Sequence, residues 1–300
     1  MQLLKNLFNI PYFKSPEVQA MKVETSFGKI SSLLLAVVVC FLLVEPTFGI
    51  PVEEDLTITY KEKVALEKFR QLVLEHLKDD YMKQDIYLIR WLRAANLDLK
   101  LAEQKLLDNL KWREENDIDN LLSEDFSDFE RDYPYTTDTY DKTGRPMIAF
   151  TFGDWDLRKA VLAGQARRFT RYLDRAFENV TTQIRAKQAR GENVTQSQFL
   201  INLENFNLAQ QGCIQCLPAI FTYFQHQVYY PNLADNIVLV NTPTVFEVVL
   251  RILRPIMAPE TRVALKVFGT NRQQWQQFLY SIIDKDQLSR DFGGTRSSYR

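Results

Sequence analysis

Hydrophobic residues follow two different patterns along this chain, and each pattern predicts its own kind of secondary structure. Across residues 61–113 the apolar side chains recur at helical spacing, as they do at Leu99, Ala102, Leu106 and Leu110. Asp98 directly precedes this run and is placed to cap the helix at its N-terminus. The pattern predicts a small all-helical lobe, which we assign to residues 50–115.

Short aliphatic runs replace the helical period after residue 140. Strand-like runs cover residues 147–152, 199–203, 237–240 and 263–268, and helical segments lie near residues 157–190, 214–230, 243–257 and 271–283. The four consecutive aliphatic residues at 237–240 are typical of a strand that is buried on both faces. Strands that alternate with helices predict an α/β fold, in which helices cover a mostly parallel sheet.

Residues 116–140 separate these two patterns. They are acidic, rich in turn formers and only weakly periodic. We interpret them as a linker, followed by a second domain at residues 141–294 and a short tail at residues 295–300.

The segment at residues 243–257 is apolar nearly all round. Thr242 can cap it, Pro243 suits a first helical turn, and Arg254 followed by Pro255 should end it. Its polar side chains are Thr244, Glu247, Arg251 and Arg254. Such a helix is either enclosed by protein, or it has one face on the domain and the other on a bound lipid or a bilayer.

Composition restricts the chemistry of the chain. With 46% hydrophobic and 25% charged residues among 300, it fits one or two globular domains with a substantial core. It has only two histidines, His76 and His226, and it lacks the H-E-x-x-H, G-x-S-x-G, Walker A and G-x-G-x-x-G motifs. We therefore expect no enzyme activity, no cofactor or metal, and no nucleic-acid partner.

Local charge and cysteine patterns leave several alternatives open. Residues 157–190 hold nine arginines and lysines against two carboxylates, although the net charge of the chain is only -1. Arg167, Arg171 and Arg175 share one helical face there, which is either a solvated surface or a docking surface for anionic membranes. The C-I-Q-C run formed by Cys213 and Cys216 could be a redox dithiol, a pair of buried thiols or a local disulfide.

The N-terminal region resembles a targeting signal. Residues 33–44 are uncharged and mostly apolar, residues 1–29 carry a net charge of +2, and residues 45–55 carry -4. We expect residues 1–49, including Cys40, to act as a secretory signal peptide or an anchor that places the main domain in the secretory pathway or outside the cell. A buried amphipathic helix and a cytoplasmic protein are the alternatives. The sequons at Asn179 and Asn193 make the chain a candidate glycoprotein.

Four short motifs, taken in this order, resemble the CRAL-TRIO lipid-binding and lipid-transfer family. They are Leu88-Ile-Arg-Trp-Leu-Arg-Ala94 with Lys111-Trp-Arg113; Asp141-Lys-Thr-Gly-Arg-Pro146; Tyr230-Pro231 through Asn241-Thr-Pro243-Thr-Val-Phe246 to Arg254-Pro255; and Phe292-Gly-Gly294. The resemblance covers residues 60–294.

This resemblance implies a helical lobe packed on a lipid-binding domain, whose sheet forms the floor of an apolar pocket closed by a mobile helix. The protein would be a monomer that binds one hydrophobic lipid without chemistry and exchanges it at a membrane surface. The implied pocket residues are Ile148, Phe150, Phe152, Phe199, Ile201, Leu203, Phe221, Val228 and Leu239. The implied gate and membrane residues are Val245, Phe246, Val249, Leu250, Leu253, Ile256 and Met257.

Three departures from the family pattern bear on the ligand. The phosphatidylinositol-binding branch of the family has a basic, an acidic and a lysine residue where this chain has Ala95, Asn232 and Ala264. A headgroup phosphate would lose a hydrogen-bonding cation here, unless Arg262 or Lys266 replaces it. We therefore expect a small hydrophobic lipid, which could be a tocopherol-like, retinoid-like or other isoprenoid compound, with phosphatidylinositol transfer and a membrane-docking scaffold as the alternatives.

Overall fold

The computed structural model describes residues 55–297, without the side chain of Ile256. The predicted signal at residues 1–49, with Cys40, and the last three residues of the predicted tail lie outside the described residues.

Three helices form the N-terminal lobe, as the helical period predicts: α5 (Tyr60–Val73), α6 (Asp85–Ala94) and α7 (Leu99–Glu115). Thr59 and Glu62 form a reciprocal capping box at the start of α5. Asp98 caps α7, because its carboxylate accepts a hydrogen bond from the Leu101 N–H at 3.0 Å. The apolar faces meet in a core that includes Phe69, Leu88, Leu92, Ala102 and Leu106.

A five-stranded sheet forms the centre of the second part of the chain. Its spatial order is β1 (Thr136–Tyr140), β2 (Pro146–Thr151), β3 (Ser197–Asn202), β4 (Ala234–Val240) and β5 (Leu265–Val267). The β1–β2 pair is antiparallel and the other three pairs are parallel. The predicted α/β class and mostly parallel sheet are thus observed.

Strand register places two apolar rows on one face of the sheet. One row runs through Ile148, Phe199, Ile237 and Leu265, and the other runs through Phe150, Ile201, Leu239 and Val267. Successive side chains of a strand point to opposite faces, so Leu200 and Val238 face the other way. There they pack against Trp275 and Leu279 of α14 (Arg272–Ile282).

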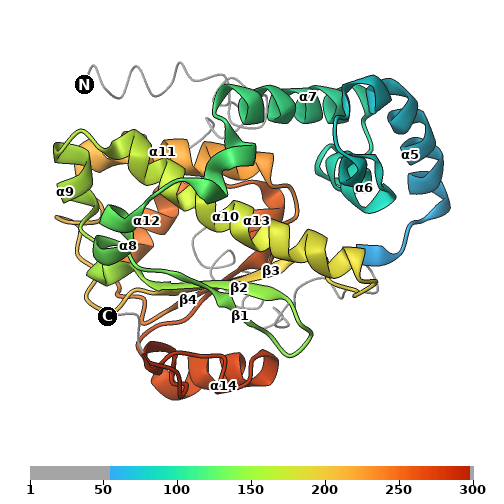
Figure 1. The fold of residues 1–300 in the computed structure, drawn as a ribbon. Coiled ribbons are helices and arrows are strands. Elements are labelled where there is room, and N and C mark those ends of the chain that lie inside the picture. Colours follow the sequence, from blue (N-terminus) through green and yellow to red (C-terminus); the bar gives the residue numbers. More distant parts are fainter. Residues whose placement is uncertain (1–54, 298–300) are drawn as a thin grey trace, which may run out of the picture. The chain divides into compact units, whose positions relative to one another are not determined.

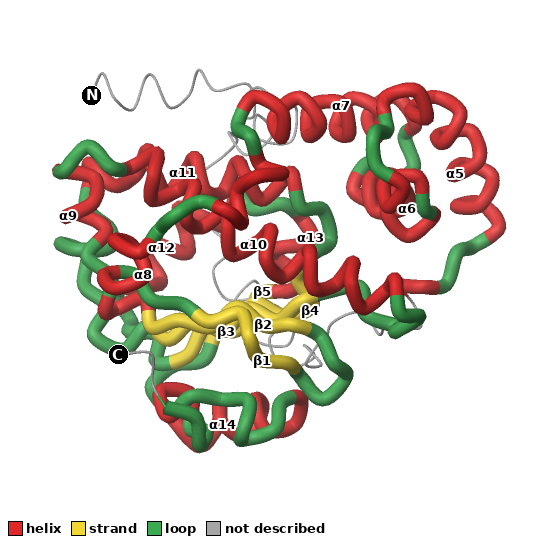
Figure 2. Tube along the Cα trace, viewed as in Figure 1, coloured by secondary structure: helices red, strands yellow, loops and turns green. Residues whose placement is uncertain are grey.

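Helices cover both faces of the sheet unequally, as Figures 1 and 2 show. Helix α14 lies alone on one side, whereas α10 (Ala166–Ala189), α11 (Leu217–His226), α12 (Phe246–Leu253) and α13 (Pro259–Ala264) lie on the other. The short helices α8 (Ser127–Asp132) and α9 (Leu157–Leu162) complete the described set. Of the described helices, none combines the length and apolar character needed to cross a membrane.

Several predicted boundaries differ from the structure. The helix predicted at 157–190 is two helices, because Gly164 adopts φ +73° between α9 and α10. Residues 263 and 264 belong to α13, so the predicted strand begins only at Leu265. The helix predicted from Pro243 begins at Phe246, and Val245 rather than Thr242 stands at its N-cap.

The acidic segment at residues 116–140, which we interpret as a linker, contains secondary structure of its own. It contains a 3₁₀ helix (Ile118–Ser123), α8 and strand β1. Phe126, Phe129 and Tyr133 are buried in the main core, at helical spacing that the weak overall periodicity concealed. Acidic side chains on the surface of this segment form ion pairs with α10, as Glu124 does with Arg171 and Glu130 with Arg175.

Candidate functional site

An apolar cavity of about 460 Å³ lies on the sheet face opposite α14. Its floor is formed by both apolar rows of the sheet, from Ile148 and Phe150 on β2 to Leu265 on β5. Its walls come from α10, α11 and α12, which contribute Phe169, Leu173, Phe177, Ile220, Tyr223, Phe224, Phe246, Leu250 and Leu253.

Most of the predicted pocket residues meet at this cavity. Those that line it are Ile148, Phe150, Phe152, Phe199, Ile201, Leu203 and Leu239. Phe221 and Val228 do not line it. On α11 the cavity-lining face carries Ile220, Tyr223 and Phe224, and Phe221 falls outside that face. Val228, beyond the helix, is 47% exposed.

Helix α12 carries apolar residues on two faces. Phe246, Val249, Leu250 and Leu253 line the cavity, as does Met257 beyond the helix. Val245 does not line it and is 40% exposed. Val248 and Ile252 remain about half exposed at the edge of the cavity. This helix is therefore not enclosed by protein on all sides: one apolar face lies on the domain and another apolar face is exposed.

Aromatic residues of other elements complete the lining, and the sequence analysis did not find them. They are Tyr135, Trp155, Phe169, Phe177, Phe206, Tyr223, Phe224 and Tyr230. The spacing of Phe169, Leu173 and Phe177 along one face of α10 is a signal that could have identified three of the wall residues.

Polar groups in the lining are few and carry little charge. They comprise Gln211, Gln227, Asn232, Glu260, Thr261 and the tyrosine hydroxyls. Burial raises the pKa of Tyr135 to about 12 and raises the pKa of Tyr223 further, so both phenols are neutral near pH 7. Among the described side chains, no lysine or arginine lines the cavity.

The three positions at which the family pattern has charge are occupied differently here. Ala95 and Ala264 are buried at the ends of α6 and α13. Asn232 has φ +55°, and its amide donates to the Asp55 carboxylate at 3.0 Å. Arg262 is exposed outside the cavity lining, and Lys266 pairs in register with Val238, whose side chain packs in the α14 core. Neither suggested replacement lines the cavity.

The predicted basic face of α10 is largely neutralised. The Arg171 guanidinium forms an ion pair with Glu124, and the Arg175 guanidinium forms one with Glu130 at 2.6 Å. Hydrogen bonding to Arg171 lowers the pKa of Glu124. Arg167 is exposed. The acidic segment at residues 116–140 thus covers the surface that the sequence left open for membrane docking.

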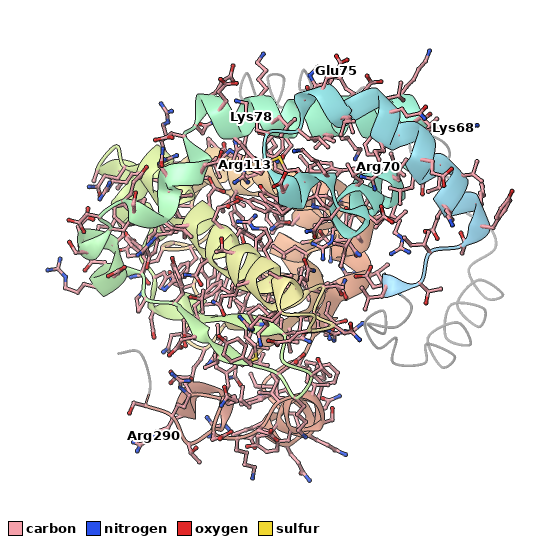
Figure 3. The ribbon with its side chains drawn as sticks, turned by 45° about the vertical axis from the view of Figure 1, so that its right-hand side comes forward. Lys68, Arg70, Glu75, Lys78, Arg113 and Arg290 are labelled. Carbon is pink, nitrogen blue, oxygen red and sulfur yellow. A yellow bond between two sulfur atoms is a disulfide. The ribbon has the colours of Figure 1, made fainter. Side chains whose placement is uncertain are left out.

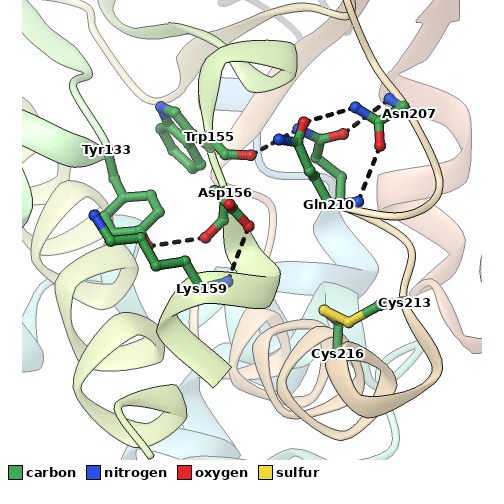
Figure 4. Close-up of a disulfide and its surroundings, with 9 residues drawn as sticks. Tyr133, Trp155, Asp156, Lys159, Asn207, Gln210, Cys213 and Cys216 are labelled. Carbon is green, nitrogen blue, oxygen red and sulfur yellow. Dashed lines mark hydrogen bonds between the residues drawn. A yellow bond between two sulfur atoms is a disulfide. The ribbon is translucent and has the colours of Figure 1, made fainter. Parts of the chain in front are cut away.

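Cys213 and Cys216 form a disulfide, one of the three alternatives for the C-I-Q-C run. Figure 4 shows it beside a loop in which the Asn207 amide donates to Gln210 Oε1 at 2.6 Å. Within residues 55–297, no cluster of three or more His, Cys, Asp or Glu side chains could hold a metal ion.

The chain is similar to one family of known proteins in sequence and in fold. Residues 130–294 fit the family model of the CRAL/TRIO domain. Phosphatidylinositol/phosphatidylcholine transfer protein SFH12 of Arabidopsis thaliana is 26% identical over 249 residues, which cover 78% of this chain and 44% of that protein. The corresponding protein SFH7 of the same plant is 27% identical over 245 residues, covering 77% and 43%.

The chain therefore spans less than half the length of these curated relatives. The crystal structure of Sfh5 aligns with a TM-score of 0.63 at 16% identity, covering 80% of this chain and 88% of that one. At that identity the likeness shows a shared fold.

Proposed function

Because this chain belongs to the CRAL/TRIO domain family of lipid-binding and lipid-transfer proteins, we propose that it holds one uncharged hydrophobic molecule in the cavity and exchanges it at membranes. The protein performs no chemistry on that molecule. The observation that carries the proposal is the apolar lining of a cavity of about 460 Å³, a size within the usual range for small-molecule sites.

Charge in the lining favours a neutral ligand over an anionic one. A phosphate group needs hydrogen-bonding cations when it leaves water, and no described lysine or arginine lines the cavity. The only described carboxylate in the lining belongs to Glu260 and would repel a phosphate. The few amide and hydroxyl groups can instead hydrogen-bond a single hydroxyl or carbonyl on an otherwise apolar molecule.

Transfer of phosphatidylinositol or phosphatidylcholine is the second candidate function. The Arabidopsis relatives SFH12 and SFH7 are phosphatidylinositol/phosphatidylcholine transfer proteins by name, and each covers more than three quarters of this chain. Under this candidate the headgroup would lie against polar residues of the lining such as Asn232, Glu260 and Thr261.

Mass spectrometry of lipid extracted from the purified full-length protein tests both candidates. We expect one stoichiometric molecule that lacks a phosphate. Stoichiometric phosphatidylinositol or phosphatidylcholine would establish the second candidate instead. Absence of any bound lipid would contradict both and would favour a membrane-docking scaffold.

The secretory location remains a proposal of its own. The charge flanks of residues 33–44 support it, and so does the Cys213–Cys216 disulfide, because disulfides persist mainly in oxidising compartments. Expression in secretory cells and N-terminal sequencing test it. A full-length product in the cytosol, without a glycan at the exposed Asn193, would contradict the proposal.

A further inference from the structure

One amide of the cavity lining is held by a carboxylate from a distant part of the sequence. Asn232 lies in the loop before β4, and its Nδ2 donates to Asp55 Oδ1 at 3.0 Å. Asp55 is only 6% exposed. Because Asn232 borders the cavity, the negative charge of Asp55 lies directly behind the lining at this residue.

Arg93 of α6 holds this carboxylate in place. Its Nη1 donates to Asp55 Oδ1 at 3.1 Å and to the Asp55 backbone carbonyl at 2.7 Å. Its Nη2 donates to the Thr57 carbonyl at 2.9 Å, and its Nε pairs with Glu62 at 2.8 Å. Charge-assisted hydrogen bonds of this kind fix the geometry of both partners. Asp55 is therefore a negative charge in a fixed position.

Arg90 brings a second positive charge to the same region, one helical turn before Arg93. Its guanidinium donates to the Thr195 carbonyl, and its buried Nε has no hydrogen-bond partner among the described residues. No described carboxylate forms an ion pair with Arg90. Burial lowers the pKa of Arg90, and the charge of Asp55 acts to raise it. Asp55 therefore acts on both arginines of α6.

Gln196 connects Arg90 with the cavity lining. It directly follows Thr195 and is 1% exposed. Its Nε2 donates to Asn232 Oδ1 at 3.3 Å and to the Asn232 carbonyl at 3.4 Å. These contacts join four residues into one polar cluster behind the lining, which we call the α6 corner: Asp55, Arg90, Arg93 and Asn232.

The charges of the α6 corner give Asp55 an effect beyond that of an ordinary ion pair. Glu62 already pairs with Arg93, so Asp55 is not the only carboxylate that neutralises Arg93. Without the charge of Asp55, Glu62 alone would balance the two arginines, and the corner would attract an anion. With that charge, an anion at Asn232 meets a like charge behind it, and burial strengthens the repulsion.

We propose that Asp55 determines specificity: its carboxylate occupies the anion position of the α6 corner and thereby excludes a phosphate group from the part of the cavity beside Asn232. This role rests on the proposed function, because it explains how the cavity selects an uncharged molecule. Exclusion of a wrong ligand by a fixed like charge is a common source of specificity. A neutral residue at position 55 would release the Asn232 amide and both arginines to bind a phosphate.

The variant Asp55→Asn tests this role in the full chain. Asparagine has nearly the same shape, and its Oδ1 can still accept from Arg93 and Asn232. The protein is incubated with phosphatidylcholine vesicles that contain equal amounts of phosphatidylinositol and of diacylglycerol with the same acyl chains. After the protein is separated from the vesicles, its bound lipids are quantified by mass spectrometry. We expect the ratio of phosphatidylinositol to diacylglycerol to be about 10-fold higher in Asp55→Asn than in the native chain.

Two control variants separate the charge of Asp55 from its surroundings. Asp55→Glu keeps the charge and should keep the ratio close to that of the native chain. Glu62→Gln removes the other carboxylate that pairs with Arg93, but Glu62 has no hydrogen bond to Asn232, so the ratio should change little. A rise in either control as large as that in Asp55→Asn would overturn the proposal, and so would an unchanged ratio in Asp55→Asn.

Binding of inorganic phosphate separates this role from the proposed function. Phosphate has the same anionic group without acyl chains, so its binding does not depend on lipid carriage. We expect calorimetry to show about 10-fold tighter phosphate binding in Asp55→Asn than in the native chain. This gain in a chain that carries no lipid would support the role of Asp55 and refute the carrier function. A native chain with a bound neutral lipid, and no gain of phosphatidylinositol or phosphate in Asp55→Asn, would refute the role of Asp55 alone.

Discussion

Arg113 of α7 and Glu178 of α10 form a buried ion pair, with Nη1–Oε1 and Nη2–Oε2 distances of 2.8 and 3.2 Å. Their side chains are only 9% and 3% exposed. Figure 3 shows Arg113 among the helices, in contrast to Lys68 at their outer edge. Because α10 also forms a wall of the cavity, this pair joins the helical lobe to the candidate binding site.

Removing one partner should destabilise the fold strongly. We expect Glu178→Ala to lower the free energy of unfolding by about 3 kcal/mol, the lower end of the range for a broken buried pair, because the exposed Asp119 carboxylate still pairs with Arg113. The control Glu115→Ala removes an exposed pair with Lys111 at 3.8 Å and should cost about 0–1 kcal/mol. Urea unfolding at pH 7 measures both values. Similar losses in the two variants would contradict the structural role of the buried pair.

The start of α5 should lose stability in acid. Burial acts to raise the pKa of Glu62, but hydrogen bonds from Arg93 and Thr59 outweigh it and lower that pKa to about 2. A lowered carboxyl pKa stabilises the fold above the unfolded pKa of about 4.3, and this contribution is lost as the pH falls toward 2.

The variant Glu62→Gln checks this pH dependence. At pH 7 it should be about 1 kcal/mol less stable than the native chain, because Gln can still complete the capping box but carries no charge to pair with Arg93. Near pH 2 the two proteins should have nearly the same free energy of unfolding. If the difference in free energy of unfolding between the two proteins stayed constant between pH 7 and pH 2, the charge of Glu62 would not contribute to stability.

Adjacent residues of β3 should respond in opposite ways to the same large side chain. Ile201 faces the cavity, so Ile201→Trp should fill that space and expel the lipid while the melting temperature changes little. Leu200 packs in the α14 core at 0% exposure, so Leu200→Trp should cost about 1–3 kcal/mol or more. Thermal unfolding measures the stability of each variant, and lipid extraction from the same preparation measures its bound lipid. Retention of lipid by Ile201→Trp would place the ligand elsewhere.

Phosphatidylinositol transfer between vesicles should be weak and should increase when a cation is added. Helical spacing places position 264 on the same face of α13 as the cavity-lining Glu260 and Thr261, so Ala264→Lys should bring an ammonium group to the part of the cavity that these two residues line. Asn232→Glu is less suitable, because position 232 has φ +55° and its amide bonds to the Asp55 carboxylate. Strong transfer by the native chain would refute the neutral-ligand argument.

The sequence by itself determined the alternation of helices and strands and the class of fold, and its resemblance to the CRAL-TRIO family implied most of the cavity floor. The strand runs are apolar at nearly every position, so their own pattern shows burial on both faces but does not say that Ile148, Phe199 and Leu239 face the cavity. The apolar residues around α12 likewise revealed two apolar faces without any knowledge of their partners. Local periodicity was sufficient because it reports the burial of each position.

Only the tertiary structure decided which surfaces meet. The arginine face of α10 resembles a free cationic surface in sequence, yet Glu124, distant in the chain, pairs with Arg171. The choice between Ile220 and Phe221 as a cavity residue depends on how α11 is rotated over the sheet. Such pairings are set by long-range packing and by the path of the chain between elements, and the period of a single segment contains neither.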